Sequence, residues 1–133
     1  MMRKVYLGSC IAIYLVEEHP AYCAGIENSL AKLNGIVCYS PLTELECLVV
    51  PLRLKRGDLV EKFGRFFALN VQLTMPDSVY REAANLRAEF GLKTPDALHL
   101  ATARFHDCSE LWTNDNRLAG GAGGVAVNLL GSA

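Results

Sequence analysis

The sequence has no surplus of charge and no long apolar run, and each absence argues against a class of protein. Its 133 residues include 13 basic and 14 acidic side chains, which argues against a protein that coats nucleic acid or a membrane through a strongly basic field, although a local basic patch is compatible with this balance. No apolar run approaches the roughly 20 residues needed to cross a bilayer. Only Val5, Tyr6 and Leu7 form the apolar segment between the basic Arg3-Lys4 and Gly8-Ser9-Cys10, which is too short for a signal peptide ending in an acylated cysteine. With 51% hydrophobic residues, we expect one folded domain, residues 1–133, in the cytoplasm and without membrane contact.

Two further motifs are missing. The five cysteines are odd in number and include no C-x-x-C pair, so they form neither a disulfide framework nor a zinc site, and we expect buried or half-buried thiols kept reduced in the cytosol. The glycine-rich stretch 120–124 lacks the lysine and the following helix of a phosphate-binding loop. We expect a turn there.

What is present is an alternation of short β-type segments with amphipathic ones. The expected strands are 3–7, 36–39, 71–74, 110–113 and a possible fifth at 125–127. The expected helices start near residues 11, 20, 41, 59, 76 and 94. Strands that alternate with helices indicate an α/β fold, a parallel sheet covered on both faces.

Several helix ends carry local signals. Asn34 and Gly35 are expected to end the second helix, and Gly91 the fifth, because these residues tolerate positive φ. Thr94 is expected to be the N-cap of the last helix, with Pro95 in its first position.

Three acidic residues fall at the carboxyl edge of the expected sheet, where open parallel sheets bind ligands. Each has an ordinary explanation: Glu46 could complete a capping box with Thr43, Asp96 could interact with a helix dipole, and Asp115 could form a turn. Together they suggest more, because clustered carboxylates repel one another and are stable when a cation neutralises them. Oxygen ligands suit Mg²⁺ or Mn²⁺, which support phosphodiester hydrolysis.

Four segments resemble those of PIN-domain nucleases, in the same order and over nearly the whole chain. They are 5–14, similar to the first strand and turn of the family; 40–46, similar to its second acidic motif; 91–103, the most specific match and similar to the VapC toxin branch; and 113–115, similar to the fourth motif. The resemblance implies a PIN-like three-layer sandwich, with a central parallel sheet of four to five strands flanked by helices.

The same resemblance implies a function. It suggests a Mg²⁺-dependent (or Mn²⁺-dependent) endoribonuclease in which Glu46, Asp96 and Asp115 bind the metal directly or through water, and Ser9 supports the carboxylates. It also implies a toxin that forms homodimers and is held inactive by a VapB-like antitoxin, whose C-terminal segment reaches the acidic groove. Lys93 lies nearest the acids in sequence and is our candidate for contact with the RNA backbone.

One departure from the family pattern concerns Gly8, which stands where the family has its first aspartate. Glycine provides no ligand, so we expect a chain that is inactive or severely impaired. Either the chain is a naturally degenerate pseudo-nuclease that only binds an antitoxin, or Gly8 is a substitution that allows a toxic protein to be expressed. The second explanation is favoured because the other motif positions are intact. His99, three residues after Asp96, is expected to be a packed or surface imidazole and not a ligand.

Overall fold

The computed structural model describes residues 3–115, 118 and 126–128, and its centre is a single parallel sheet. The strands lie in the order β3-β2-β1-β4-β5, and all neighbouring pairs are parallel. Their bounds are β1 Arg3–Leu7, β2 Gly35–Tyr39, β3 Val71–Gln72, β4 Glu110–Thr113 and β5 Ala126–Asn128. The predicted parallel sheet of four to five strands is confirmed.

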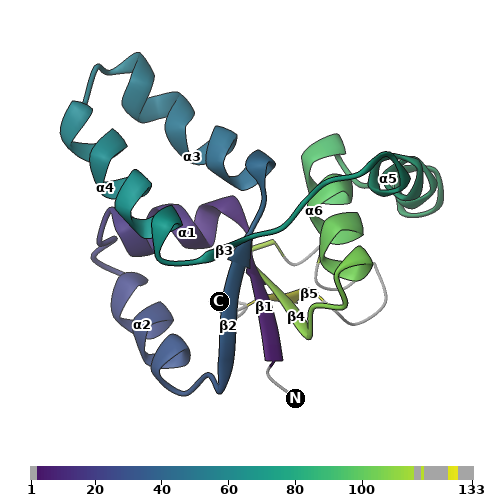
Figure 1. Cartoon of the computed structure of the whole chain (residues 1–133), viewed down its shortest axis with the longest axis horizontal. Helices are drawn as coiled ribbons and strands as arrows, with labels where there is room; N and C mark the ends of the chain where they lie inside the picture. Colours follow the sequence, from purple (N-terminus) through teal and green to yellow (C-terminus); the bar gives the residue numbers. More distant parts are fainter. Residues whose placement is uncertain (1–2, 116–117, 119–125, 129–133) are drawn as a thin grey trace.

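Helices cover both faces of this sheet and complete the predicted three-layer sandwich. The described helices are α1 Ser9–Val16, α2 Cys23–Ala31, α3 Pro41–Arg53, α4 Gly57–Ala68, α5 Asp77–Phe90 and α6 Thr94–Phe105. In Figure 1, α1 to α4 lie on one side of the sheet and α5 and α6 on the other.

The alternation of side chains along β1 divides the core between these two layers, because neighbouring strand residues point to opposite faces. Val5 and Leu7 are fully buried in a cluster with Phe63 and other residues of the α1–α4 layer. Tyr6, also fully buried, belongs to the opposite cluster with residues of α5 and α6, among them Leu100. Of the cysteines, all of which are free, Cys10 is exposed, contrary to expectation.

The glycine signals were interpreted correctly at one helix end and wrongly at the other. Gly91 ends α5 in the left-handed conformation, with φ 68°, as predicted. However, α2 already ends at Ala31, and Gly35 is the first residue of β2. A Cβ atom at Gly35 would lie 2.0 Å from the carbonyl oxygen of Arg3 on β1. Glycine is needed here for the close approach of two strands and not for a turn.

The predicted capping box at the start of α3 is also wrong. The N-cap is Ser40, whose side chain accepts a hydrogen bond from the backbone N–H of Thr43, while the Thr43 hydroxyl accepts one from the backbone N–H of Ser40. Ser40 and Thr43 therefore complete the capping box without Glu46, which lies one turn further along the helix. The Glu46 carboxylate is left to contact other parts of the molecule.

Other boundaries differ by one to three residues. Helix α6 starts at Thr94, so Lys93 and not Thr94 occupies the N-cap. Strand β3 is shorter than the predicted 71–74, and β5 is described for 126–128. The glycine-rich stretch 120–124 and Val125 lie outside the described residues. None of the helices in the described ranges has the length and apolarity to span a bilayer.

The strand order creates a crevice beside β1. The chain proceeds from β1 outward through β2 to β3, and then returns through α5 and α6 to β4 on the other side of β1. The connections that leave β1 and β4 therefore diverge at the carboxyl ends of these strands, where α/β sheets bind ligands.

Candidate active site

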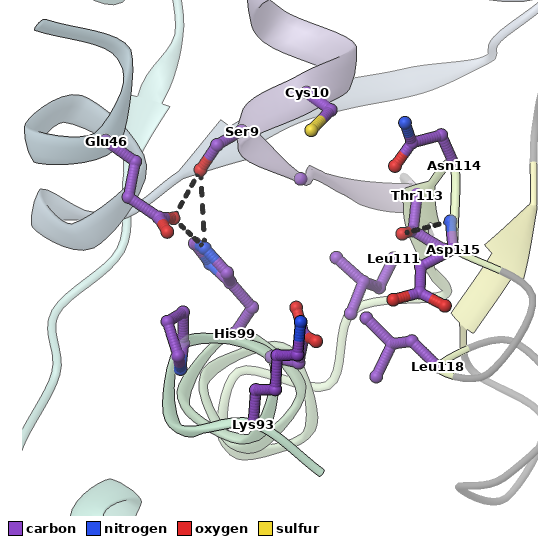
Figure 2. A pocket seen from close by; sticks show the side chains of 13 residues that line it. Ser9, Cys10, Glu46, Lys93, His99, Leu111, Thr113, Asn114, Asp115 and Leu118 are labelled. Carbon is purple, nitrogen blue, oxygen red and sulfur yellow. Dashed lines mark hydrogen bonds and ion pairs between the residues drawn. The ribbon is translucent and has the colours of Figure 1, made fainter. Parts of the chain in front are cut away.

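A cleft of about 270 Å³ opens at the carboxyl ends of β1 and β4. Its lining comes from the start of α1, the middle of α3, the start of α6 and the segment after β4 (Figure 2). The lining residues are Gly8, Ser9, Cys10, Glu46, Lys93, Pro95, Asp96, His99, Leu111, Thr113, Asn114, Asp115 and Leu118. Every residue that the sequence singled out as a candidate for the site lies on this cleft.

The three predicted acids reach the cleft from three different elements. Glu46 lies on α3, Asp96 in the first turn of α6, and Asp115 two residues after β4. Each is partly exposed. The backbone N–H of Asp115 donates a hydrogen bond to the Thr113 hydroxyl at 3.0 Å, which helps to shape the turn that carries this residue.

The Glu46 carboxylate is held by two donors. Its Oε1 atom accepts a hydrogen bond from Ser9 Oγ at 2.5 Å and lies 2.6 Å from His99 Nε2. Burial raises the pKa of Glu46, but the hydrogen bonds from His99 and Ser9 outweigh it and hold that pKa below its usual value. Ser9 therefore contacts one of the carboxylates that it is predicted to support.

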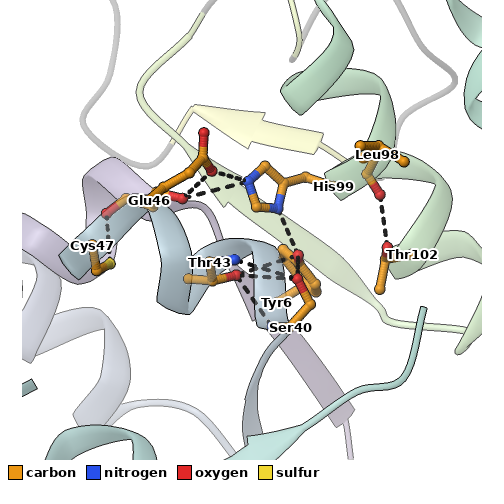
Figure 3. A network of polar contacts seen from close by, with 9 residues as sticks. Tyr6, Ser40, Thr43, Glu46, Cys47, Leu98, His99 and Thr102 are labelled. Carbon is orange, nitrogen blue, oxygen red and sulfur yellow. Dashed lines mark hydrogen bonds and ion pairs between the residues drawn. The ribbon is translucent and has the colours of Figure 1, made fainter. Parts of the chain in front are cut away.

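Behind His99 lies a buried network of hydroxyl groups (Figure 3). The Tyr6 hydroxyl lies 2.6 Å from His99 Nδ1 and 2.6 Å from Ser40 Oγ, and it accepts a hydrogen bond from Thr43 Oγ1 at 3.3 Å. Tyr6 is fully buried and His99 is 5% exposed. Within the described residues, no buried side-chain nitrogen or oxygen lacks a partner. Polar groups thus form a continuous chain from the core to the cleft.

Asp96 is in a less favourable electrostatic environment. Burial, followed by the charges of Asp115 and Glu46, raises the pKa of Asp96, and the nearby His99 and Lys93 only partly oppose this effect. Partial burial and the acids of the cleft likewise raise the pKa of the exposed Cys10 thiol. After burial, the negative charges of Asp115 and Glu46 therefore oppose ionisation of Asp96.

Gly8 directly follows β1 and lies against the end of β4. Its backbone N–H donates to the carbonyl oxygen of Trp112 at 2.8 Å. A Cβ atom added at position 8 would lie 2.8 Å from the same oxygen, which is closer than such contacts occur, and the obstacle is backbone that cannot rotate away. An aspartate at this position therefore requires the two strands to move apart.

The donor set of the cleft consists of three carboxylates, the oxygen ligands that a hard divalent cation prefers. It is not a closed cage. Among the residues that the structure describes, no three His, Cys, Asp or Glu side chains form a group that could hold a metal ion. Glu46, Asp96 and Asp115 therefore line the same cleft without forming a preassembled metal site.

His99 is the packed imidazole that the sequence analysis expected, but its contact with Glu46 was not foreseen. Its spacing from Asp96 places both residues near the same side of α6, which was a usable signal. Nothing in the sequence indicates that Tyr6 on β1 would meet His99 on α6, because that contact depends on how the two elements pack.

Comparison with known proteins identifies the family. The sequence model of the PIN domain matches residues 5–123, and the chain belongs to the PIN domain family. The resemblance drawn from the four sequence motifs is confirmed at this level. A search of curated proteins found no match.

Several solved structures share the fold. A toxin-antitoxin complex from Klebsiella pneumoniae matches with a TM-score of 0.79 and 22% identity, over 94% of this chain and 97% of that one. VapBC2 from Rickettsia felis, bound to a promoter DNA fragment, matches with a TM-score of 0.80 and 18% identity, over 93% and 97% of the chains. VapC20 of Mycobacterium tuberculosis, a toxin that cleaves the sarcin-ricin loop, matches with a TM-score of 0.72 and 14% identity, over 89% and 96%. The chain thus has the PIN fold found in toxins of the VapC type.

Proposed function

We propose that this chain is a VapC-type toxin, a single PIN domain built as a Mg²⁺- or Mn²⁺-dependent endoribonuclease and impaired because Gly8 provides no carboxylate. The observation that carries the proposal is that Glu46, Asp96 and Asp115 all line one cleft at the carboxyl ends of β1 and β4. The likeness of the fold to solved toxins supports it.

Each residue of the cleft has a part in this proposal. Glu46, Asp96 and Asp115 provide oxygen ligands, and Ser9 holds Glu46 in place. The exposed Lys93, at the mouth of the cleft, contacts a phosphate of the RNA backbone. The chemistry that a divalent cation supplies here is activation of a water molecule and stabilisation of the leaving oxygen.

The partners we propose are a VapB-like antitoxin and a second copy of this chain, both in the cytoplasm. The surface of helix α3 supports the proposal of an antitoxin partner. This helix carries Glu46 and exposes Leu45, Val49 and Leu52, which are 59%, 47% and 59% accessible. These three positions recur at helical spacing and form one apolar face of α3. An amphipathic antitoxin segment would cover this face and direct a basic side chain to the acids.

The tight packing at Gly8 favours a second candidate function, a pseudo-nuclease that only binds the antitoxin. The position of the missing acid is closed by the Trp112 carbonyl, so this backbone is adapted to glycine. In this alternative the cleft accepts the basic side chain of the antitoxin but no longer supports cleavage.

An RNA cleavage assay separates the two functions. We would compare the unchanged chain, Gly8→Asp, and Gly8→Ala as the control that adds a Cβ atom without a charge, each with Mg²⁺ or Mn²⁺ and with EDTA. Cleavage that appears only in Gly8→Asp with metal, and is abolished by a further Asp96→Asn substitution, supports the nuclease. If a folded Gly8→Asp protein binds metal and cuts no RNA, the binding module is the correct function.

A further inference from the structure

The turn between α3 and α4 and the helix that follows it carry an excess of positive charge. Residues 53–65 include five basic and two acidic side chains, whereas the whole chain has 13 basic and 14 acidic ones. Three residues of the turn, Arg53, Lys55 and Arg56, are basic and exposed. In Figure 1 this turn lies at the upper left, at the end of the two helices that is away from the sheet. The balanced charge of the chain therefore includes a local basic patch.

Two cations of this patch have no carboxylate partner. The other basic residues of 53–65 form the ion pairs Arg56–Asp58, Lys62–Glu18 and Arg65–Glu61. In the part of the chain that the structure describes, neither Arg53 nor Lys55 forms an ion pair or a side-chain hydrogen bond. Both can therefore bind an anionic ligand without breaking an existing ion pair.

Helix α3 connects this patch to the cleft. Arg53 follows Glu46 by seven residues, which is close to two helical turns, so both side chains lie on the same side of α3. Val50, four residues after Glu46 and 45% exposed, lies between them. The strip formed by these three residues runs for about 10 Å along the helix axis. It is distinct from the apolar face proposed for the antitoxin.

A groove beside the turn adds apolar surface to the patch. Its volume is about 470 Å³, within the range of about 300–1,000 Å³ that is typical of small-ligand sites. The lining includes the apolar Leu52 and Val60 and the cationic Lys55 and Arg56. Glu61, an acidic residue of the lining, forms an ion pair within α4. Apolar side chains next to cations suit a nucleotide, which combines a flat base with an anionic phosphate.

We propose that the turn between α3 and α4 binds the backbone of a single-stranded RNA that runs from the cleft along α3, with Arg53 and Lys55 each contacting a phosphate. This inference rests on the proposed ribonuclease function and adds to it a second RNA contact, separate from Lys93. Successive phosphates of a stacked strand rise by about 3.4 Å, so the phosphates bound at the turn lie about three nucleotides from the bond in the cleft. The continuity of the strip with the cleft favours RNA over an acidic protein segment.

The test is the binding of a fluorescent single-stranded oligouridine to the full-length chain in EDTA, measured by anisotropy over a series of KCl concentrations. Each phosphate contact contributes about 0.7 to the slope of log affinity against log salt. We expect Arg53→Gln and Lys55→Gly each to reduce the magnitude of this slope by about 0.7, which weakens binding about fivefold at about 0.1 M salt. Arg65→Gln is the matched control, because it removes an exposed arginine that is paired with Glu61. We expect it to leave the slope unchanged.

Lys55→Gly also separates RNA binding from folding. Lys55 follows the C-cap of α3 in the left-handed conformation, with φ 54°. Its N–H donates to the Leu52 carbonyl oxygen at 3.1 Å, and the N–H of Arg56 donates to that of Pro51 at 2.9 Å, an arrangement in which glycine is preferred. We therefore expect Lys55→Gly to melt at a higher temperature than the unchanged chain while it binds RNA more weakly. A lower melting temperature with an unchanged salt slope would give Lys55 a structural role only and overturn its part in RNA binding.

The outcomes separate this inference from the proposed function. If Arg53→Gln, Lys55→Gly and Arg65→Gln change the slope equally, or none of them changes it, the turn is not an RNA site. If oligoglutamate displaces the fluorescent oligouridine as well as unlabelled oligouridine does, the patch binds acidic protein segments, and the inference is overturned. It is also overturned if the unchanged chain binds no oligouridine. The nuclease function is judged separately, and fails if a folded Gly8→Asp protein binds metal and cuts no RNA.

Discussion

At the scale of single residues, Gly8 affects both packing and charge. A Cβ atom there would lie 2.8 Å from the Trp112 carbonyl oxygen, and an added carboxylate would face three others. We therefore expect Gly8→Ala to lose stability, by about 1–3 kcal/mol for overpacking less about 0.5–1 kcal/mol gained by replacing glycine. Gly8→Asp should lose more in EDTA, since repulsion between carboxylates is added.

Divalent cations should offset the loss of stability in Gly8→Asp more than in the other two proteins. A ligand that binds only the folded state stabilises it in proportion to the logarithm of its concentration, so Gly8→Asp should gain more stability from millimolar Mg²⁺ or Mn²⁺ than Gly8→Ala or the unchanged chain. Thermal melts over a series of metal concentrations measure this gain. Equal and weak responses from all three proteins, with no RNA cleavage, would mean that these acids are not a nuclease site.

Asp96 is expected to show a conflict between stability and function. Its pKa is raised in the fold, so its ionised form destabilises the native state. Asp96→Asn should therefore be more stable than the unchanged chain in EDTA at neutral pH, by roughly 0.5 kcal/mol after solvent screening of a half-buried group. The same change should weaken Mn²⁺ binding. Lower stability of Asp96→Asn at pH 7 in EDTA would contradict this prediction.

The pH dependence of this difference has a definite sign. Because the native pKa of Asp96 is raised, its destabilisation is fully present above that pKa and disappears below the unfolded value of about 3.9. Glu46 has the opposite effect, since its native pKa is lowered. Its stabilisation is fully present above the unfolded value of about 4.3 and is lost as pH falls through the native pKa. Denaturant unfolding between pH 3 and 7 would measure the difference in stability between Asp96→Asn and the unchanged chain. We expect this difference to disappear as the pH falls.

The acids of the site could be placed from the sequence because each follows a strand or begins a helix in an alternating α/β pattern, and such positions gather at one edge of the sheet. Their partners could not be placed in this way. The contact of His99 with Glu46 joins α6 to α3, and that of Tyr6 with His99 joins β1 to α6. Both depend on packing between elements, which local spacing does not specify.

At the scale of elements, Gly35 and Gly64 provide a matched pair of test positions, because one is crowded and the other open. A Cβ atom at Gly35 would lie 2.0 Å from the Arg3 carbonyl oxygen, whereas one at Gly64, inside α4, would meet nothing within 4 Å. We expect Gly35→Ala to disturb the pairing of β1 and β2 and to destabilise the protein by more than about 2 kcal/mol. Gly64→Ala should stabilise it by about 0.5–1 kcal/mol.

Chemical denaturation of both variants tests this contrast. If Gly35→Ala leaves the free energy of unfolding unchanged, β1 and β2 can move apart without cost, which would contradict this prediction. The surroundings of Gly35 also explain why the sequence analysis misplaced the end of α2. Glycine after asparagine usually ends a helix, and only the position of the neighbouring strand reveals that Gly35 serves close packing between strands.

At the scale of the whole molecule, the apolar face of α3 is the feature that most requires a partner. We expect Leu52→Glu, at a residue 59% exposed, to weaken antitoxin binding at least tenfold, about 1.4 kcal/mol. Its effect on the stability of the isolated chain should stay within about 0.5 kcal/mol. Tyr80→Glu, on α5 in the opposite layer and 52% exposed, is the control.

Calorimetry with a VapB-like antitoxin, and sedimentation of the chain with and without it, would measure these effects. A chain that sediments as a monomer both alone and in the mixture would contradict the proposed homodimer and antitoxin together. Equal loss of binding in Leu52→Glu and Tyr80→Glu would place the antitoxin elsewhere.

The contact between Gly8 and Trp112 also has an evolutionary consequence. Glycine and aspartate codons differ by a single base, so an acid at position 8 is easily reached by mutation. The backbone geometry nevertheless opposes it, because any side chain at this position meets the Trp112 carbonyl oxygen. Recovery of an acid would then require a second change that widens the space between β1 and β4. Selection for RNA cleavage from a randomised library should yield aspartate at position 8 mainly in clones that also carry substitutions near Trp112.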